Sequence, residues 1–300
     1  MSPAAIIALM LVAGAFHACW NLVAKSVIVD RYIFLVTVTT CTGIVLLPWA
    51  FLHLPSTSVL GPAVGYVLVR GLTDAIYIFA LSRCYQSLDL SLAYPLVRGI
   101  GPLVATLLAV VLLGERPALV GLIGIAVSSI AIGSMAWTGR ASRDRALAGS
   151  TQPPSPARTI GGGPFWIGLT GLMIGSYTVI DKAAMVYWDP VSYLCFVELV
   201  AAVILGTPTL LRGHRLAVVE TVRHHYLAVI GCAVCVSVSY VLALVALKHA
   251  YASYVAPLRE VSVLFGVFMG IVILKEKRAR RRIPSAFGIL LGLALVGLAL

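Results

Sequence analysis

Residues 92–113 read LAYPLVRGIGPLVATLLAVVLL, an apolar run in which Arg98 is the one charged residue. A helix rises about 1.5 Å per residue, so about 20 apolar residues cross the roughly 30 Å of hydrocarbon in a bilayer. The strands of a membrane barrel are shorter and alternate apolar with polar residues, which this run does not. The run is therefore predicted to be a transmembrane helix.

The rest of the chain repeats this pattern. Of its 300 residues, 60% are hydrophobic and 11% are charged, whereas an ordinary soluble domain is about 25% charged. A soluble fold of this length would expose much of that apolar surface. We therefore predict an all-α integral membrane protein whose ten transmembrane helices span residues 4–24, 32–52, 61–82, 92–113, 118–137, 164–186, 190–211, 226–247, 253–274 and 284–300.

The net charge of +11 comes from basic residues that lie in the gaps between the apolar runs. Sixteen Lys or Arg residues follow the odd-numbered helices, against three in the loops of the other face. Cytoplasmic loops carry an excess of Lys and Arg, which places the odd-numbered loops in the cytoplasm and both termini outside. We therefore expect a multi-pass protein of the cell membrane, a bacterial inner or plasma membrane, that binds no nucleic acid.

Two stretches of the chain repeat each other's spacing. Arg98 precedes Glu115 by 17 positions, and Arg259 precedes Glu276 by the same 17. A second match has a constant offset of 157 and pairs Trp20, Asn21 and Lys25 with Tyr177, Thr178 and Lys182. Five helices per half is an odd number, so the second copy must enter the membrane upside down. The spacing therefore predicts a 5+5 inverted repeat.

The repeat divides the chain into two halves. Residues 1–137 form the first repeat with helices one to five, and residues 164–300 form the second with helices six to ten. Between them, residues 138–163 hold several basic residues, three prolines and three consecutive glycines. Such a stretch cannot pack a core, so it is predicted to be a flexible linker.

These residues resemble the EamA-type branch of the drug/metabolite transporter superfamily over nearly the whole chain. The resemblance rests on Trp20-Asn21 with Lys25, Ala80-Leu81-Ser82-Arg83, Ser91-Leu92-Ala93-Tyr94-Pro95-Leu96, Leu113-Gly114-Glu115-Arg116, Tyr177 to Lys182, and Ser253-Tyr254-Val255-Ala256-Pro257-Leu258-Arg259-Glu260. It implies a 5+5 inverted repeat, a central cavity lined mainly by helices 1, 3, 4, 6, 8 and 9, and export or exchange of metabolites. Ten-helix relatives tend to keep both termini in the cytoplasm, so the orientation from the charge count departs from the family.

Arg98 and Arg259 are candidate substrate-binding residues. Each lies about six residues inside its span, roughly 9 Å deep, and inversion of the repeats would bring both toward the midplane. A guanidinium binds carboxylate or phosphate in a bidentate manner, so the pair predicts an anion site. Alternatively, Glu260 neutralises Arg98 in a structural ion pair. Candidate aromatic walls, each of which could equally be a packing residue, are Tyr94, Tyr77, Trp20, Tyr177 and Tyr240.

Ionisable side chains at membrane depth need a partner or a wet cavity. Arg70 and Asp74 are four residues apart in one helix and can form an ion pair, although Asp74 is also a candidate for coupling. Glu198 has no partner nearby in the sequence and is a second coupling candidate. His17 is a third, or else a packing histidine. The small four-helix relatives instead carry protons on an acid in the first helix, and span 4–24 has none.

Other conspicuous residues are interpreted as structural. Glu115 and Glu276 close the fourth and ninth spans and have basic neighbours, which favours pairing at the membrane surface. Cys232 and Cys235 form a CxxC that lacks a second pair or nearby histidines, so we expect no metal site.

The leading hypothesis is a secondary transporter that moves small polar or anionic metabolites, amino-acid-like or organic-acid-like, by alternating access. The alternatives are a multidrug exporter of cationic hydrophobic compounds and an exchanger of unknown substrate. We expect no enzyme, because the sequence offers no placed nucleophile and base, and no cofactor. The expected partners are a small-molecule substrate and the lipid bilayer, with a homodimer left open. No Gly-rich Lys motif for ATP is found, so energy must come from gradients or exchange.

Overall fold

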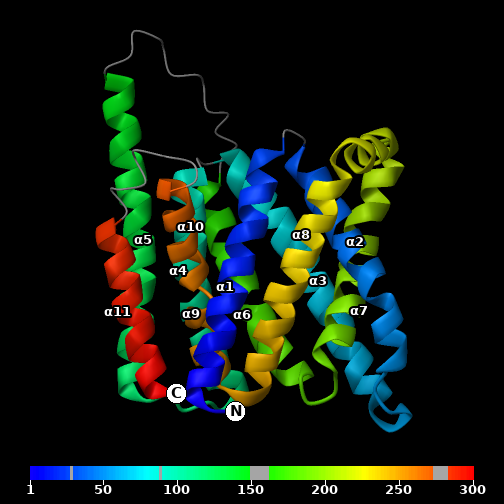
Figure 1. Cartoon of the computed structure of the whole chain (residues 1–300), viewed down its shortest axis with the longest axis horizontal. Helices are drawn as coiled ribbons and strands as arrows, with labels where there is room; N and C mark the ends of the chain where they lie inside the picture. Colours follow the sequence, from blue (N-terminus) through cyan, green and yellow to red (C-terminus); the bar gives the residue numbers. More distant parts are fainter. Residues whose placement is uncertain (28–29, 88–89, 149–161, 273–282) are drawn as a thin grey trace. The chain divides into compact units, whose positions relative to one another are not determined.

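The computed structural model describes every residue except 28–29, 88–89, 149–161 and 273–282 (Figure 1). Within the described residues the chain is helical and contains no strand. The helices are α1 (Pro3–Ser26), α2 (Arg31–Leu52), α3 (Leu60–Ser87), α4 (Leu90–Leu113), α5 (Leu119–Ala148), α6 (Gly163–Ala184), α7 (Pro190–Leu211), α8 (Arg215–His249), α9 (Ala252–Leu258), α10 (Val261–Val272) and α11 (Ile283–Ala299), with a short 3-10 turn at Thr57–Val59.

The predicted membrane spans are confirmed. In the described part of the chain, nine helical stretches are long and apolar enough to cross a bilayer, and Ile283–Ala299 is a shorter apolar helix. The stretch Ala252–Met269 counts as one span although it joins two helices. The protein is therefore an all-α, multi-pass integral membrane protein. The 5+5 inverted repeat stays a prediction.

Two helices extend beyond their predicted limits. Helix α5 continues to Ala148, so the first part of the predicted linker 138–163 is helical and the rest, up to 161, lies outside the described residues. The last turns of α5 hold Ala and Arg, which both favour helix. Hydropathy predicts where a helix leaves the hydrocarbon, but it does not predict where the helix itself ends. Helix α8 begins at Arg215 rather than at residue 226, and its backbone is non-helical at His225 (φ −128°, ψ 24°).

The predicted ninth span is broken into two helices. Helix α9 ends at Leu258 and α10 begins at Val261, with Arg259 and Glu260 between them. Glu260 N donates a hydrogen bond to the Pro257 carbonyl at 2.9 Å, a contact one residue shorter than in an α-helix. The predicted span is confirmed as one apolar stretch, and the interruption within it is a short turn of 3-10 type. The backbone stays hydrogen-bonded through the turn, for example from Arg259 N to the Val255 carbonyl at 3.1 Å and from Val263 N to the Glu260 carbonyl at 2.9 Å.

The chain forms two compact units, each assembled from both predicted halves. The first unit comprises Met1–Ile78 and Tyr177–Ala250, and the second comprises Phe79–Ser176 and Tyr251–Leu300. In the first unit α1 packs against α8, and α2 packs against α7 and α8. In the second unit α5 packs against α4 and α11, and α9 packs against α4 (Figure 1). Helices distant in sequence therefore supply each other's buried faces, and the units do not follow the predicted repeat boundaries.

Glu115 ties the loop after α4 to the start of α9 in the second unit. Its Oε1 accepts a hydrogen bond from Ala252 N at 2.6 Å, and its Oε2 accepts from Ser253 N at 3.0 Å and from Ser253 Oγ at 2.6 Å. Gly114, at φ +68°, makes the left-handed turn that points the carboxylate inward. Glu115 is buried, so the interpretation as a surface pair with a basic neighbour was wrong. An anion here also complements the helix dipole.

We expect Glu115→Gln to destabilise the protein, because an amide oxygen cannot replace both carboxylate acceptors. A lost charge-assisted hydrogen bond with buried donors costs about 1–3 kcal/mol. Thermal unfolding of detergent-solubilised protein measures the change as a lower Tm. Glu220→Gln, which removes an exposed acid on α8, is the matched control. Equal melting of the two variants would contradict the capping role.

Candidate functional site

Arg70 on α3 is the centre of a buried polar network in the first unit. Its side chain is 3% exposed. The guanidinium donates from Nε to Asp181 Oδ1 at 2.9 Å, from Nη1 to Asp74 Oδ1 at 2.8 Å, and from Nη2 to the Tyr240 hydroxyl at 2.7 Å. The predicted ion pair between Arg70 and Asp74 is therefore confirmed, and it is part of a larger arrangement.

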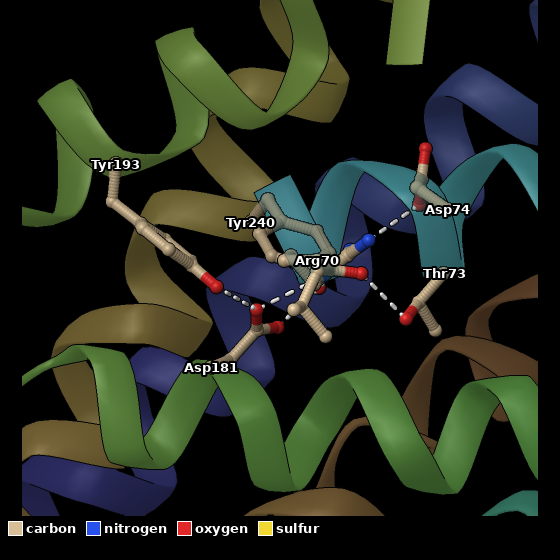
Figure 2. A network of polar contacts seen from close by, with 7 residues as sticks. Arg70, Thr73, Asp74, Asp181, Tyr193 and Tyr240 are labelled. Carbon is tan, nitrogen blue, oxygen red and sulfur yellow. Dashed lines mark hydrogen bonds and ion pairs between the residues drawn. The ribbon is translucent and has the colours of Figure 1, made fainter. Parts of the chain in front are cut away.

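Asp181 on α6 is the second centre of this network, and sequence reasoning missed it. Its side chain is fully buried. Besides Arg70, it accepts hydrogen bonds from the Tyr193 hydroxyl at 3.0 Å and from the Tyr240 hydroxyl at 2.5 Å. Figure 2 shows Tyr193 and Arg70 converging on the Asp181 carboxylate. The sequence did carry a signal for Asp181, because it is an acid inside the apolar run 164–186. The neighbouring Lys182 drew the attention instead, since Lys182 belongs to the match between the two repeats.

Tyrosine rings cover the Arg70 guanidinium. Its Cζ lies 4.4 Å from the ring centroid of Tyr177 and 5.5 Å from that of Tyr240, both within cation–π range. Tyr77 meets the Tyr177 ring edge-on, with the centroids 5.8 Å apart. Three of the predicted aromatic residues therefore gather around Arg70. For Tyr94, the side chain lies outside what the structure describes.

Glu198 on α7 borders the same network. It is buried and lies within electrostatic reach of Asp74 and Arg70. Helices α3 and α7 approach closely here. A Cβ atom placed on Gly71 would lie 2.4 Å from Val200 Cγ1 and 3.3 Å from the Val197 carbonyl oxygen, so only glycine fits. The turn of α3 that carries Arg70 is thus pressed against the turn of α7 that carries Glu198.

His17 and Trp20 contact each other within α1. Trp20 Nε1 donates a hydrogen bond to His17 Nδ1 at 3.3 Å, and the rings meet edge-on with centroids 5.4 Å apart. The Trp20 carbonyl accepts from Cys232 Sγ at 3.6 Å. These contacts pack His17 and Trp20 within the first unit. The coupling role of His17 stays a prediction.

Arg98 and Glu260 form a separate ion pair in the second unit. Arg98 Nη1 lies 3.1 Å from Glu260 Oε1, and their side chains are 9% and 3% exposed. The other carboxylate oxygen, Glu260 Oε2, has no hydrogen-bond partner among the described residues. Arg259 is half-buried and lies directly at the break between α9 and α10. The predicted alternative, that Glu260 neutralises Arg98, is therefore observed, and it occurs beside the broken helix.

The two networks differ in their balance of charge. Around Arg70 the described residues include three carboxyl groups, those of Asp74, Asp181 and Glu198. At the break of the ninth span, two guanidiniums accompany Glu260. Within the described residues, no group of three or more His, Cys, Asp or Glu side chains could hold a metal ion. The chemistry available at these sites is charge pairing, hydrogen bonding and proton binding.

Charged residues that are buried and paired inside membrane spans mark the pathways of solutes and protons. This combination is typical of multi-pass membrane transporters. The family matches agree: residues 161–298 match the EamA-like transporter family, and residues 61–128 match the Small Multidrug Resistance proteins. Both families belong to the drug/metabolite transporter superfamily. The resemblance in the sequence is confirmed, and the protein is a membrane transporter of the drug/metabolite type with an EamA-like second half.

A solved crystal structure of another protein has the same fold. It aligns over 98% of this chain and 96% of its own length with a TM-score of 0.63, at 15% sequence identity. At this identity the likeness concerns the fold alone. No curated protein matches the sequence significantly.

Removal of Arg70 is expected to destabilise the first unit severely. Arg70→Ala leaves Asp74 and Asp181 buried without their cation, and breaking such a pair costs about 3–5 kcal/mol. Denaturant or thermal unfolding in detergent measures the loss, with the exposed Arg223→Ala as the matched control. If charge is the cause, the double variant Arg70→Ala/Asp181→Asn is more stable than Arg70→Ala alone. A double variant that is less stable than the single would point to lost packing instead.

Proposed function

We propose that the protein is a secondary transporter that moves small polar or anionic metabolites, amino-acid-like or organic-acid-like, across the cell membrane by alternating access. The observation that carries this proposal is the buried Arg98–Glu260 ion pair at the break of the ninth span. The transporter family sets the class of activity, and the ion pair supports the substrate class.

The ninth span changes its hydrogen-bond pattern at Arg259 and Glu260, where a short 3-10 turn separates α9 from α10. Secondary transporters commonly use such discontinuous helices to bind their substrates. Here the break lies at Arg259 and Glu260, directly beside the Arg98 guanidinium. The break thus supports a role for these side chains in binding a polar solute.

The charge at the break fits an anionic group. Among the described residues at the break, Arg98 and Arg259 are the cations and Glu260 is the acid. A carboxylate on a substrate offers Arg98 the acceptor geometry that Glu260 now offers, and it can bind the guanidinium through two parallel hydrogen bonds. Glu260 therefore acts as an internal counterion, which holds Arg98 in the membrane until a substrate replaces it.

Alternating access follows from the predicted inverted repeat. Arg98 and Arg259 occupy matched positions, each 17 residues before a glutamate. In inverted repeats, corresponding helices can exchange conformations, so that the site opens first to one side of the membrane and then to the other. The sequence has no ATP-binding motif, so gradients or exchange drive the cycle.

Transport by proteoliposomes tests the proposal, with radiolabelled L-alanine, L-aspartate and malate as probes. Arg98→Ala is expected to reduce uptake of the anionic probes about tenfold or more, because a charge-assisted hydrogen bond contributes about 1.5–3 kcal/mol. Arg98→Lys, which keeps the charge but loses the bidentate geometry, is expected to retain part of the activity. The exposed Arg223→Ala is the control. Undiminished uptake in both Arg98→Ala and Arg259→Ala would exclude the anion site.

A second candidate function is export of cationic hydrophobic compounds. The Small Multidrug Resistance match over residues 61–128 favours it, as do the acids and tyrosines around Arg70. The two functions predict different results for two variants, Asp74→Asn and Arg98→Ala. Loss of ethidium efflux in Asp74→Asn, with Arg98→Ala unaffected, would favour the multidrug function over the anion transporter.

A further inference from the structure

The turn between α7 and α8 presents two arginines at the surface of the first unit. It runs from Leu211, the last residue of α7, to Leu216 in the first turn of α8. Arg212 and Arg215 lie between these leucines, and both are exposed. Neither guanidinium takes part in the ion pairs found among the described residues. Both charges are therefore available to an anion outside the protein.

Backbone hydrogen bonds fix the shape of this turn. The N–H groups of Arg212, Gly213 and His214 donate to carbonyls in the last turn of α7 at 3.1, 3.1 and 3.2 Å. Gly213 lies at φ +83°, a left-handed conformation that favours glycine, and it turns the chain toward α8. Arg212 and Arg215 are three residues apart across the turn, so their guanidiniums can reach one group. Arg223 follows Arg215 by eight residues, about 12 Å along the helix, and is too distant to share that group.

The length of α7 places this turn at the depth of the lipid headgroups. Helix α7 has 22 residues and therefore rises about 33 Å, slightly more than the roughly 30 Å of hydrocarbon in a bilayer. It begins at Pro190, after the capping Asp189, and ends at Leu211. The two ends of α7 thus lie at the two membrane surfaces. The turn follows its upper end in Figure 1.

The two leucines that flank the arginines indicate contact with lipid. Leu211 is 82% exposed and Leu216 is 80% exposed. Apolar side chains are unfavourable in water, whereas the acyl chains of a bilayer accept them. An arginine at the same depth can keep its aliphatic stem beside apolar groups while its guanidinium reaches the phosphates. Leucines and arginines on one exposed turn therefore fit the boundary between acyl chains and headgroups.

The charge around the turn favours an anionic lipid. Residues 206–226 contain three arginines and a single acid, Glu220. The predicted orientation puts this turn, which follows the seventh span, on the cytoplasmic side, where the leaflet carries anionic lipids. A guanidinium binds phosphate through two parallel hydrogen bonds. A phosphatidylcholine also has a phosphate, but two arginines would repel its positively charged choline group.

We propose that residues 211–216 bind the headgroup of an anionic phospholipid. Arg212 and Arg215 contact its phosphate, and Leu211 and Leu216 contact its acyl chains. The site belongs to the first unit, whereas the Arg98–Glu260 pair belongs to the second. Lipid binding therefore does not depend on the identity of the transported substrate or on the direction of transport.

Native mass spectrometry tests the role of the arginines. Purified protein is released from nanodiscs with equal amounts of phosphatidylglycerol and phosphatidylcholine, and the ratio of the two lipids that stay bound is measured. Wild type is expected to retain an excess of phosphatidylglycerol. Each arginine near an anionic surface strengthens binding about fivefold, so Arg212→Ala/Arg215→Ala is expected to lower the ratio about tenfold or more. Arg212→Lys/Arg215→Lys, which keeps the charge but loses the bidentate geometry, is expected to lie in between.

The matched control is Arg116→Ala/Lys248→Ala, which removes two exposed cations from other helix ends. This variant is expected to keep the wild-type ratio. All the exchanged side chains are exposed, and an unchanged Tm in neutral detergent confirms that each variant is folded. Equal retention of the two lipids by wild type would overturn the proposal. An undiminished ratio in Arg212→Ala/Arg215→Ala, or an equal loss in the control, would overturn it as well.

A further variant separates a lipid from a free anion. Leu211→Ser/Leu216→Ser keeps both arginines, and it is expected to lower the amount of phosphatidylglycerol that stays bound because the acyl-chain contacts are lost. An excess of inorganic phosphate is expected to leave the lipid bound to wild type. Unchanged retention in the serine variant, or displacement of the lipid by phosphate, would assign the turn to a free anion instead.

Discussion

Hydrocarbon offers no hydrogen bonds, so every charged or backbone group that enters a membrane span must find its partner within the protein. This constraint accounts for most of the polar contacts described above. Arg70 meets it with two carboxylates, a hydroxyl and two aromatic faces, and Arg98 meets it with Glu260. Among the described residues, Glu260 Oε2 is a buried oxygen for which this constraint is not met by a hydrogen bond.

The same constraint governs the helix ends. Glu115 satisfies the first N–H groups of α9, and Lys182 Nζ donates to the carbonyls of Leu247 at 2.7 Å and Ala250 at 2.9 Å at the end of α8. Asp189 caps α7: burial alone would raise the pKa of its carboxyl, but hydrogen bonds from Ser192, Trp49 and Val191 lower it below its usual value. That cap is therefore retained above the usual range of an aspartate and lost only as the pH falls below it.

Much of this architecture could be predicted from the sequence, because hydropathy over about 20 residues reports the membrane thickness directly. The pairing of Arg70 with Asp74 was equally accessible, since i,i+4 residues share a helix face. The break at Arg259 and Glu260 could not be predicted, because Pro257 resembles a proline in the first turn of a helix. A proline alone also does not predict a break, since Pro95 and Pro102 lie within the continuous helix α4. Asp181 was missed because its partners Arg70, Tyr193 and Tyr240 come from three other helices. The spacing of residues within one helix gives no information about contacts with other helices.

The length of α8 has a consequence for how the protein sits in its bilayer. A straight helix of 35 residues would measure about 52 Å, far more than the hydrocarbon thickness. The non-helical residue His225 divides it, and the segment before this bend exposes Leu216 and Val219 together with Arg215 and Arg223. Such a segment suits the boundary between headgroups and acyl chains. The segment before His225 can therefore lie along the membrane surface while the rest of α8 crosses the hydrocarbon.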